Sequence, residues 1–536
     1  MDWNLADVFE AVAEAIPDAP AQRQGVTAHT WRDLDRRANA VAADLLDAGL
    51  THQSKVAAYA QNGPEYLETY LAAFKAAFVP VNTNFRYGPN EVRYLFDNAD
   101  AEAVVFQARY AEVVDAVRGD LPKVRRWYVI DDESGERPDW ATPYAEVADP
   151  GADRPSTTWG RSGDDLLLLY TGGTTGMPKG VMWRQDDLFQ VLGRGGSVPL
   201  GVDPVDSIDQ LRARTTEPGP VMLPACPVMH GTGQFSAFIA FGLGGSLVFL
   251  PPGHFEASEL WDTVEEHRVN TIVIVGDAFA RPMLAELDAG PPRDLSSVAG
   301  ITSSGVMWSQ EVKDGLLRHL PQAMLVDSYG SSEAVGMGAS VSTADGSAKT
   351  AAFVLGDRVK VITDDDRLVE PGSDDVGVVA ITGHIPVGYY GDEEKTKATF
   401  RIVDGVRYSI PGDYATVEAD GTLKLLGRGS VCINTGGEKV FPEEVEEVLK
   451  LDERVADAVA VGVPDDRFGE AICAVVEPTS GASVVDDELV ALVREHLAPY
   501  KSPRHVVEVE TIGRAPNGKV DYRRLRELAT ERVASR

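Results

Sequence analysis

Glycines, threonines and one lysine crowd a single short segment of the chain. Thr171-Gly172-Gly173-Thr174-Thr175-Gly176 is followed, three residues after its last glycine, by Lys179. Glycines let the main chain approach a ligand closely, and inward-turned N–H groups form a concave anion site. Hydroxyls add donors and the lysine adds a positive charge, which together suit a triphosphate. No Gly-Lys-Ser/Thr closes the loop, so it is not the Walker pattern. A flexible surface turn is the plain alternative.

The elements around this segment predict how it is positioned. Leu166 to Tyr170 is an unbroken apolar run, typical of a strand buried on both faces. Upstream, Thr30-Trp31-Arg32-Asp33 resembles a capping box that opens a helix. A strand at 55–60, a helix at 65–77, a strand beginning at 79–81, a helix at 91–98 and a strand at 103–106 are expected in that order. Alternation of strand and helix predicts a largely parallel sheet with helices on both faces.

Length, charge and cysteine content narrow the class of protein. The chain has 536 residues, which predicts two or more cores. Its net charge of −33 argues against nucleic acid or an anionic membrane as a general partner. Three widely spaced cysteines form neither a disulfide framework nor a zinc site, which favours a reducing cytoplasm. The first residues do not resemble a signal peptide, and the apolar run at 235–250 is broken by glycines, so no transmembrane segment is expected.

Two stretches carry little signal. Residues 131–163 are rich in Pro, Gly and Asp and are expected to form a surface connection. Residues 195–220 have weak periodicity and form an excursion to which the sequence assigns no role.

The segment YTGGTTGMPKGV at 170–181 resembles the phosphate-binding motif of the adenylate-forming superfamily. That superfamily contains acyl- and aryl-CoA synthetases, peptide-synthetase adenylation domains and luciferases. Three further motifs resemble those of the family in the same order: DSYGSSE at 327–333, PGD at 411–413 and PNGK at 516–519. The resemblance covers nearly the whole chain. The sequence around these motifs is most similar to that of fatty-acyl-CoA synthetases, including activators of steroid side-chain carboxylates.

The resemblance implies an α/β fold in two parts. A large N-terminal domain of αβ-layered subdomains with mostly parallel sheets would span residues 1–428. A small, mobile α+β domain would span residues 429–536. The hinge would lie near Gly429-Ser430, although the family usually has Asp or Lys at the position of Ser430.

Residue roles follow from the matched motifs. The resemblance implies that ATP is bound by Thr171, Gly172, Gly173, Thr174, Thr175, Gly176, Lys179, Gly305, Asp327, Ser328, Tyr329, Gly330, Ser331, Asp413 and Arg428. It implies that Gly436, Gly437 and Lys439 border the CoA channel. Mg²⁺ would be held by Glu333 and Thr175, since hard oxygen ligands suit it. Catalysis would rest on Lys519, Glu333, Ser332 and His230. The plain alternative for Ser332-Glu333 is a helix N-terminus with a capping serine.

The implied reaction has two halves. A carboxylic acid is first joined to AMP from ATP with release of pyrophosphate, and the acyl group then passes to CoA. No basic residue stands out among the candidate pocket positions His230, Gly305, Val306 and Met307, which favours an apolar acid. The alternatives are an aryl or other carboxylic acid–CoA ligase, an enzyme that loads a carrier protein, a luciferase-like oxygenase and a non-enzymatic nucleotide-binding regulator. A homodimer is left open.

Overall fold

The computed structural model forms two compact units. The first comprises residues 1–350 with 382–409, and the second comprises 351–381 with 410–536. The structure describes residues 2–134, 137–148, 152–171, 177–197, 200–306, 308–347, 352–428, 431, 433–435, 438–465, 469–497, 499–515 and 520–535. The limits of these compact units differ from the domain boundary expected between residues 428 and 429. That boundary stays a prediction.

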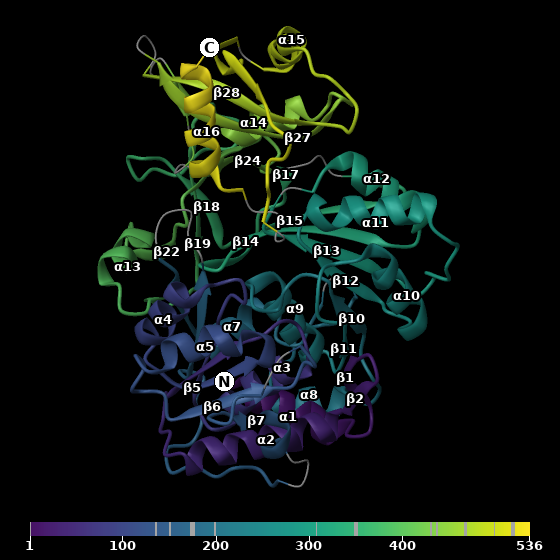
Figure 1. Ribbon diagram of the computed structural model, residues 1–536, viewed down its shortest axis with the longest axis vertical. Helices are drawn as coiled ribbons and strands as arrows, with labels where there is room; N and C mark the ends of the chain where they lie inside the picture. The colour runs from purple at the N-terminus through teal and green to yellow at the C-terminus, as the bar shows by residue number, and fades with distance from the viewer. Residues whose placement is uncertain are drawn as a thin grey trace. The chain divides into compact units, whose positions relative to one another are not determined.

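The first unit contains two large sheets (Figure 1). Within the described residues, the first sheet has eight strands in the order β20-β9-β8-β4-β3-β5-β6-β7. Its strands are β3 (Lys55–Tyr59), β4 (Val79–Asn82), β5 (Ala101–Gln107), β6 (Arg126–Ile130), β7 (Thr142–Pro143), β8 (Leu166–Thr171), β9 (Lys179–Arg184) and β20 (Gly388–Tyr389). The pairs from β8 through β7 are parallel, whereas β9 is antiparallel to both β8 and β20.

The second sheet is also mostly parallel. Its nine described strands run in the order β16-β15-β14-β13-β12-β10-β11-β1-β2. They are β1 (Pro20–Gln24), β2 (Thr27–Thr30), β10 (Val221–Pro224), β11 (Ser246–Phe249), β12 (Thr271–Ile274), β13 (Gly300–Ser304), β14 (Met324–Ser331), β15 (Ala334–Thr343) and β16 (Gly346–Ser347). Antiparallel pairs occur at its two margins: β1 pairs with β2 at one margin, and β15 pairs with both β14 and β16 at the other.

Helices cover these sheets. They are α1 (Leu5–Ala15), α2 (Trp31–Asp47), α3 (Pro64–Lys75), α4 (Pro89–Asn98), α5 (Ala111–Arg118), α6 (Tyr144–Val147), α7 (Gln185–Val191), α8 (Ile208–Arg214), α9 (Gly231–Gly242), α10 (Ala257–His267), α11 (Asp277–Ala289), α12 (Gln310–His319) and α13 (Glu393–Thr399). The predicted capping box at Thr30 and Asp33 opens α2, because each side chain bonds the other residue's backbone N–H. A hairpin of β21 (Phe400–Val403) and β22 (Val406–Ser409) follows α13.

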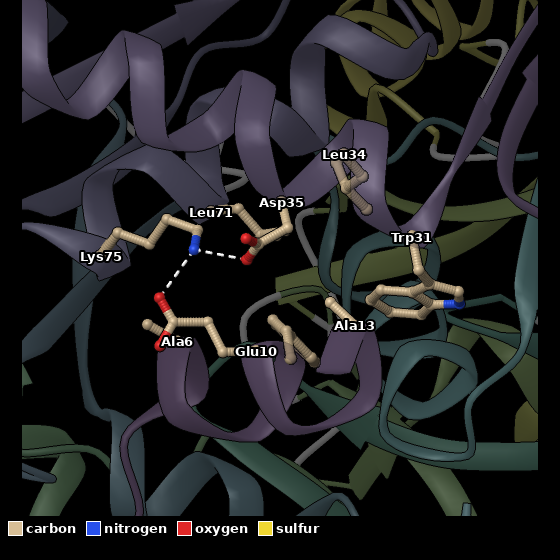
Figure 2. A pocket seen from close by; sticks show the side chains of 9 residues that line it. Ala6, Glu10, Ala13, Trp31, Leu34, Asp35, Leu71 and Lys75 are labelled. Carbon is tan, nitrogen blue, oxygen red and sulfur yellow. Dashed lines mark hydrogen bonds and ion pairs between the residues drawn. The ribbon is translucent and has the colours of Figure 1, made fainter. Parts of the chain in front are cut away.

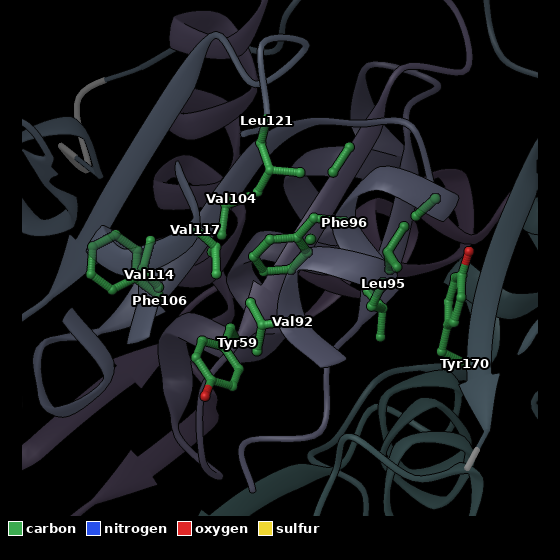
Figure 3. Close-up of a cluster of buried hydrophobic side chains, with 14 of the residues drawn as sticks. Tyr59, Val92, Leu95, Phe96, Val104, Phe106, Val114, Val117, Leu121 and Tyr170 are labelled. Carbon is green, nitrogen blue, oxygen red and sulfur yellow. The ribbon is translucent and has the colours of Figure 1, made fainter. Parts of the chain in front are cut away.

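One core lies between the eight-stranded sheet and the helices α4 and α5. Figure 3 shows Leu95 and Phe96 of α4 together with Val114 of α5 and Phe106 of β5. Tyr170, at the end of β8, belongs to the same cluster and is 4% exposed. The residue that precedes the glycine–threonine loop is thus anchored in a core, which fixes where the loop starts.

An aromatic cluster joins helices from the two sheets. Phe238 of α9 lies 5.9 Å, centroid to centroid, from Phe74 of α3 and 6.3 Å from Tyr70. Phe241 of α9 lies 4.9 Å from Trp31 at the start of α2. Because α3 packs on the first sheet and α9 on the second, these rings hold the sheets together within one unit.

A buried group of charges ties α1, α2 and α3 together (Figure 2). Lys75 Nζ lies 2.7 Å from Glu10 Oε1 and 2.6 Å from Asp35 Oδ1. Arg161 reaches the same glutamate, with Nη1 2.7 Å from Oε2. Burial raises the pKa of Glu10, but hydrogen bonds and charges from Arg161 and Lys75 outweigh it and lower the pKa to about 2. The expected surface connection therefore contributes a nearly buried arginine to the core.

The 195–220 excursion also packs against the fold. It contains the short helix α8, which contacts α1. A Cβ on Gly219 would lie 2.2 Å from the carbonyl oxygen of Leu243, so only glycine fits this close approach. The excursion is thus tied to the end of α9, and no ligand role follows from its position.

The second unit contains an antiparallel sheet and an α+β region. The sheet strands are β17 (Ala352–Phe353), β18 (Val359–Ile362), β19 (Gly377–Thr382), β23 (Asp413–Val417) and β24 (Leu423–Arg428). The α+β region contains β25 (Ile433–Thr435), β26 (Glu438–Val440), β27 (Val455–Asp465), β28 (Gly469–Pro478), β29 (His505–Glu508), α14 (Pro442–Leu449), α15 (Asp486–His496) and α16 (Tyr522–Ala534). Proline is the first residue of α14, a position that suits a residue without a backbone N–H.

The predicted fold class is confirmed: the larger unit has parallel-rich sheets with covering helices, and a smaller unit of strands and helices accompanies it. In the part of the chain that the structure describes, no helix has both the length and the apolar composition needed to cross a membrane.

Candidate functional site

The ends of a β-hairpin hold the predicted phosphate loop. Thr171, the last residue of β8, is the Cα partner of Lys179, the first residue of β9. Lys179 therefore stands at the base of the loop. Its Nζ lies 3.4 Å from Asp392 Oδ2 and 5.9 Å from the ring centroid of Tyr389. Its side chain is 34% exposed, so the charge stays accessible to a ligand.

Asn82 fixes the start of this loop. Its Nδ2 donates to the carbonyl oxygens of Tyr170 at 2.8 Å and Met229 at 2.7 Å, and its Oδ1 accepts from the backbone N–H of Tyr170. The side chain is buried and uses both donor hydrogens and its acceptor. One asparagine at the end of β4 thus joins the loop to the residue that precedes His230.

The carboxyl ends of the parallel strands bring further predicted residues to one edge of the nine-stranded sheet. His230 follows β10 and is the N-cap of α9. Gly305 follows β13 with φ of +96°, a conformation that favours glycine. A Cβ on Gly305 would lie 3.8 Å from Thr232 Oγ1, in the first turn of α9. In open sheets, ligands bind outside such strand ends, so this edge is the expected pocket.

The Ser332-Glu333 pair forms the turn between β14 and β15. The alternative of a helix N-terminus is therefore wrong, because the chain continues as an antiparallel strand. Trp183 Nε1 donates to the carbonyl oxygen of Ser332 at 2.9 Å. Ser409 Oγ donates to the carbonyl oxygen of Glu333 at 2.7 Å, and Tyr389 OH donates to Glu333 Oε1 at 2.8 Å. Three side chains from other strands thus hold a two-residue turn.

The remaining residues of β14 differ in exposure. Asp327 is 6% exposed, and its Oδ2 lies 3.2 Å from Nζ of the buried Lys313. Burial raises the pKa of Asp327, and Lys313 offsets only part of this effect. Tyr329 is buried on the same strand, and Ser328 is the Cα partner of Ser304 at the end of β13. Gly330 follows directly. Cofactor roles for these four residues stay predictions.

The second unit brings two predicted nucleotide contacts together. Asp413 at the start of β23 is the Cα partner of Arg428 at the end of β24. Asp413 is nearly buried. Lys439, expected at the CoA channel, lies on β26 with Asn434 as its Cα partner. The roles of these residues stay predictions.

Several predicted residues lie outside the described part of the chain. They are Gly172, Gly173, Thr174, Thr175, Gly176, Met307, Gly429, Ser430, Gly436, Gly437 and Lys519.

The described residues fit the implied Mg²⁺. Glu333 offers a carboxylate whose Oε1 is oriented by Tyr389, and carboxylate oxygens are the ligands that this cation prefers. Ser331 Oγ, two residues away, is buried and has no hydrogen-bond partner within the described residues. An orphaned hydroxyl at the end of the strand that leads into this turn suits a polar ligand.

Family models match most of the chain. The model for the AMP-binding enzyme matches residues 9–390, and the model for the AMP-binding enzyme C-terminal domain matches residues 444–519. The chain belongs to the AMP-binding enzyme family.

Curated relatives resemble this AMP-binding enzyme over its whole length. A 3-oxocholest-4-en-26-oate–CoA ligase from Rhodococcus rhodochrous is 42% identical, covering 98% of this chain and 95% of the relative. A medium/long-chain-fatty-acid–CoA/3-oxocholest-4-en-26-oate–CoA ligase from Mycobacterium tuberculosis H37Rv is also 42% identical, covering 99% and 97%. The predicted resemblance to fatty-acyl-CoA synthetases is confirmed.

Solved structures share the fold. The anthranilate CoA ligase AuaEII in complex with anthranoyl-AMP has a TM-score of 0.85 at 20% identity, covering 99% of this chain and 98% of its own. ATP-bound MatB from Rhodopseudomonas palustris has a TM-score of 0.81 at 25% identity, covering 99% of both chains.

Sequence reasoning missed four residues that hold the candidate site of this AMP-binding enzyme in place: Asn82, Trp183, Tyr389 and Ser409. The side chain of each forms hydrogen bonds with a part of the chain that is distant in sequence. Their local patterns are those of ordinary strand residues. The segment IPVGYY at 385–390, which contains Tyr389, has no feature that points to Glu333.

Proposed function

We propose that this chain is an AMP-forming acyl-CoA synthetase for a fatty acid or a bulky apolar acid such as a steroid side-chain carboxylate. One observation of the structure supports the proposal most directly. Lys179 and Glu333, which come from separate motifs, both contact Tyr389: one faces its ring and the other accepts from its hydroxyl. A cation for phosphate and a carboxylate for Mg²⁺ thus lie around one side chain, as binding of a metal–nucleotide complex requires.

The first half-reaction joins the acid to AMP. A carboxylate oxygen attacks the α-phosphorus of ATP, the bond from that phosphorus to the bridging oxygen breaks, and pyrophosphate leaves. Both reactants are anions, so catalysis depends on positioning and on neutralising charge. In this proposal Lys179 and the loop at 171–176 hold the phosphates, and Glu333 with Thr175 holds the cation. Mg²⁺, when bound, neutralises phosphate charge.

The second half-reaction transfers the acyl group. The CoA thiolate attacks the acyl carbon of the mixed anhydride, and AMP leaves with the bonding electrons of the acyl–oxygen bond. Lys519 is proposed to contact the carboxylate and the α-phosphate in the first half-reaction and to be dispensable in the second.

The proposed acid is apolar. Two curated relatives at 42% identity are named for medium- and long-chain fatty acids and for a steroid side-chain acid. In this chain, the segment that leads to His230 is apolar and buried, with Val228 and Met229 almost inaccessible to solvent. Gly305 adds no side chain opposite the first turn of α9. The missing side chain leaves room beside this apolar segment, which favours a bulky hydrocarbon over a charged substrate.

A panel of carboxylic acids tests the proposal. Fatty acids of increasing length, a steroid side-chain acid, an aromatic acid and an amino acid are incubated with ATP, CoA and Mg²⁺. We expect acid-dependent pyrophosphate release and a thioester of matching mass, with fatty or steroid acids preferred. Pyrophosphate without thioester would favour the carrier-loading alternative. Absence of pyrophosphate with every acid would contradict the proposed synthetase.

Two further properties belong to the proposal. We place the reaction in the cytoplasm, because the sparse cysteines suit a reducing compartment. A homodimer stays a prediction that sedimentation of the purified protein would test.

A further inference from the structure

We infer that Tyr389 is the positioning residue for Glu333: it holds one carboxylate oxygen and leaves the other for the nucleotide-bound cation. The inference rests on the proposed function. The main chain of the Ser332-Glu333 turn is fixed, because Trp183 and Ser409 donate hydrogen bonds to its two successive carbonyl oxygens. With the backbone held, the direction of the Glu333 carboxylate depends on what its side chain contacts.

That contact is the Tyr389 hydroxyl, which donates to Glu333 Oε1 at 2.8 Å. A carboxylate that accepts through one oxygen keeps its second oxygen for a ligand. Groups that orient a metal ligand in this way are needed for full metal affinity, although they do not touch the metal.

Tyr389 is itself held rigidly. It is 5% exposed, and as the last residue of β20 it is the Cα partner of Val181. Its backbone N–H donates to Thr396 Oγ1 at 2.9 Å, and its ring lies 5.8 Å from that of Phe400 at an interplanar angle of 62°. A hydroxyl on so constrained a ring has little freedom to leave its acceptor.

The Tyr389 ring also faces Lys179, the second proposed nucleotide contact. Lys179 Nζ is 5.9 Å from the Tyr389 ring centroid, within the range of a cation–π interaction. Tyr389 therefore contacts both Lys179, at the base of the phosphate loop, and the Glu333 carboxylate of the β14–β15 turn. We expect a change at its hydroxyl to affect the cation requirement first, because the ring that faces Lys179 stays in place.

The test compares Tyr389→Phe with Tyr390→Phe. The neighbouring Tyr390 is a matched control, since its hydroxyl also donates to a carboxylate, Asp100 Oδ2, at 2.6 Å. ATP binding is titrated calorimetrically at increasing Mg²⁺, which yields the cation concentration for half-maximal binding. We expect Tyr389→Phe to need about 10- to 100-fold more Mg²⁺ at an unchanged melting temperature. Tyr390→Phe is expected to match the wild type.

A double mutant sharpens the assignment. In a Glu333→Gln background, Tyr389→Phe is expected to cause no further shift, because the oriented carboxylate is already gone. An equal Mg²⁺ requirement in Tyr389→Phe and the wild type, or an equal shift in both tyrosine variants, would overturn the inference. If the wild type releases no pyrophosphate with any acid, the proposed function fails instead, so the two failures are distinguishable.

Discussion

At the scale of single residues, the proposed phosphate ligand Lys179 already forms an ion pair. Lys179 lies 3.4 Å from Asp392, and both side chains are about one-third exposed. Exposed ion pairs of this kind are weak, at about 0.2–1 kcal/mol. An incoming phosphate therefore has little to displace, yet Asp392 still adds a negative charge beside the expected phosphate position.

Removing the negative charge of Asp392 should strengthen ATP binding. We expect Asp392→Asn to lower the Kd for ATP by roughly two- to fivefold, which corresponds to about 0.4–1 kcal/mol. Equilibrium titration with ATP and Mg²⁺ measures the change. Glu393→Gln is the control, because this neighbouring carboxylate pairs with Lys397 on α13 and not with Lys179. Weaker ATP binding by Asp392→Asn would show that the pair positions Lys179 productively.

At the scale of elements, buried polar side chains fix where loops begin. Asn82 at the end of β4 bonds the main chain of β8 and of the segment before α9, while Asn62 bonds the carbonyl oxygens of Pro224 and Cys226 in that same segment. Amides serve this purpose because each offers two donors and one acceptor without charge.

Asn82→Asp tests this arrangement. The new carboxylate faces two carbonyl oxygens where the amide donated, so a buried charge is left uncompensated. We expect a loss of about 3–5 kcal/mol in the free energy of unfolding, measured by urea titration. Asn84→Asp is the matched control, since Asn84 Oδ1 accepts from the backbone N–H of Arg86 at an exposed site and Asp can do the same. Similar losses in both variants would contradict the role of Asn82.

The helix cluster around Glu10 predicts a pH dependence. The pKa of Glu10 is lowered to about 2, so its ionised form stabilises the folded state above the unfolded-state pKa near 4.5. This contribution, about 3 kcal/mol, is lost as the pH falls from about 4.5 toward 2. We expect Glu10→Gln to reduce the free energy of unfolding by about that amount at pH 7, with a difference from wild type that shrinks below pH 4.5.

Urea unfolding at several pH values between 7 and 3.5 measures this difference. Glu14→Gln on the same helix is the control, because Glu14 pairs with Arg212 at an exposed site and should contribute about 0–1 kcal/mol. A difference that does not depend on pH would mean that Glu10 stabilises by packing alone.

At the scale of the whole molecule, the proposed function depends on motifs from distant parts of the sequence. Lys519 belongs to the last of these motifs, far along the chain from the phosphate loop and Glu333. We expect Lys519→Ala to slow acid-dependent pyrophosphate release about 10²- to 10³-fold, the effect of removing one preorganised charge donor. Supplied with preformed acyl-AMP and CoA, the variant should still form thioester at close to the wild-type rate. Equal loss in both half-reactions would contradict the proposed role of Lys519.

Local chemistry explains what the sequence by itself determined. The parallel-rich fold, the capping box of α2 and the strand that leads into the glycine–threonine loop all follow from residue types within a few positions, because backbone geometry and hydrogen bonding act over that range. The order of the motifs was enough to predict the family. The structure added that Lys179 opens the next strand and pairs with Thr171, which closes the loop as a hairpin.

Only the tertiary structure decided how the site is held together. Glu333 is bonded by Tyr389 and Ser409, 56 and 76 positions away, and Ser332 by Trp183, 149 positions away. No local pattern encodes such contacts, because a buried tyrosine or tryptophan on a strand looks the same whether its polar atom bonds the Ser332-Glu333 turn or any other acceptor. The packing of two sheets against shared helices brings these strands together, and that packing is a property of the folded chain.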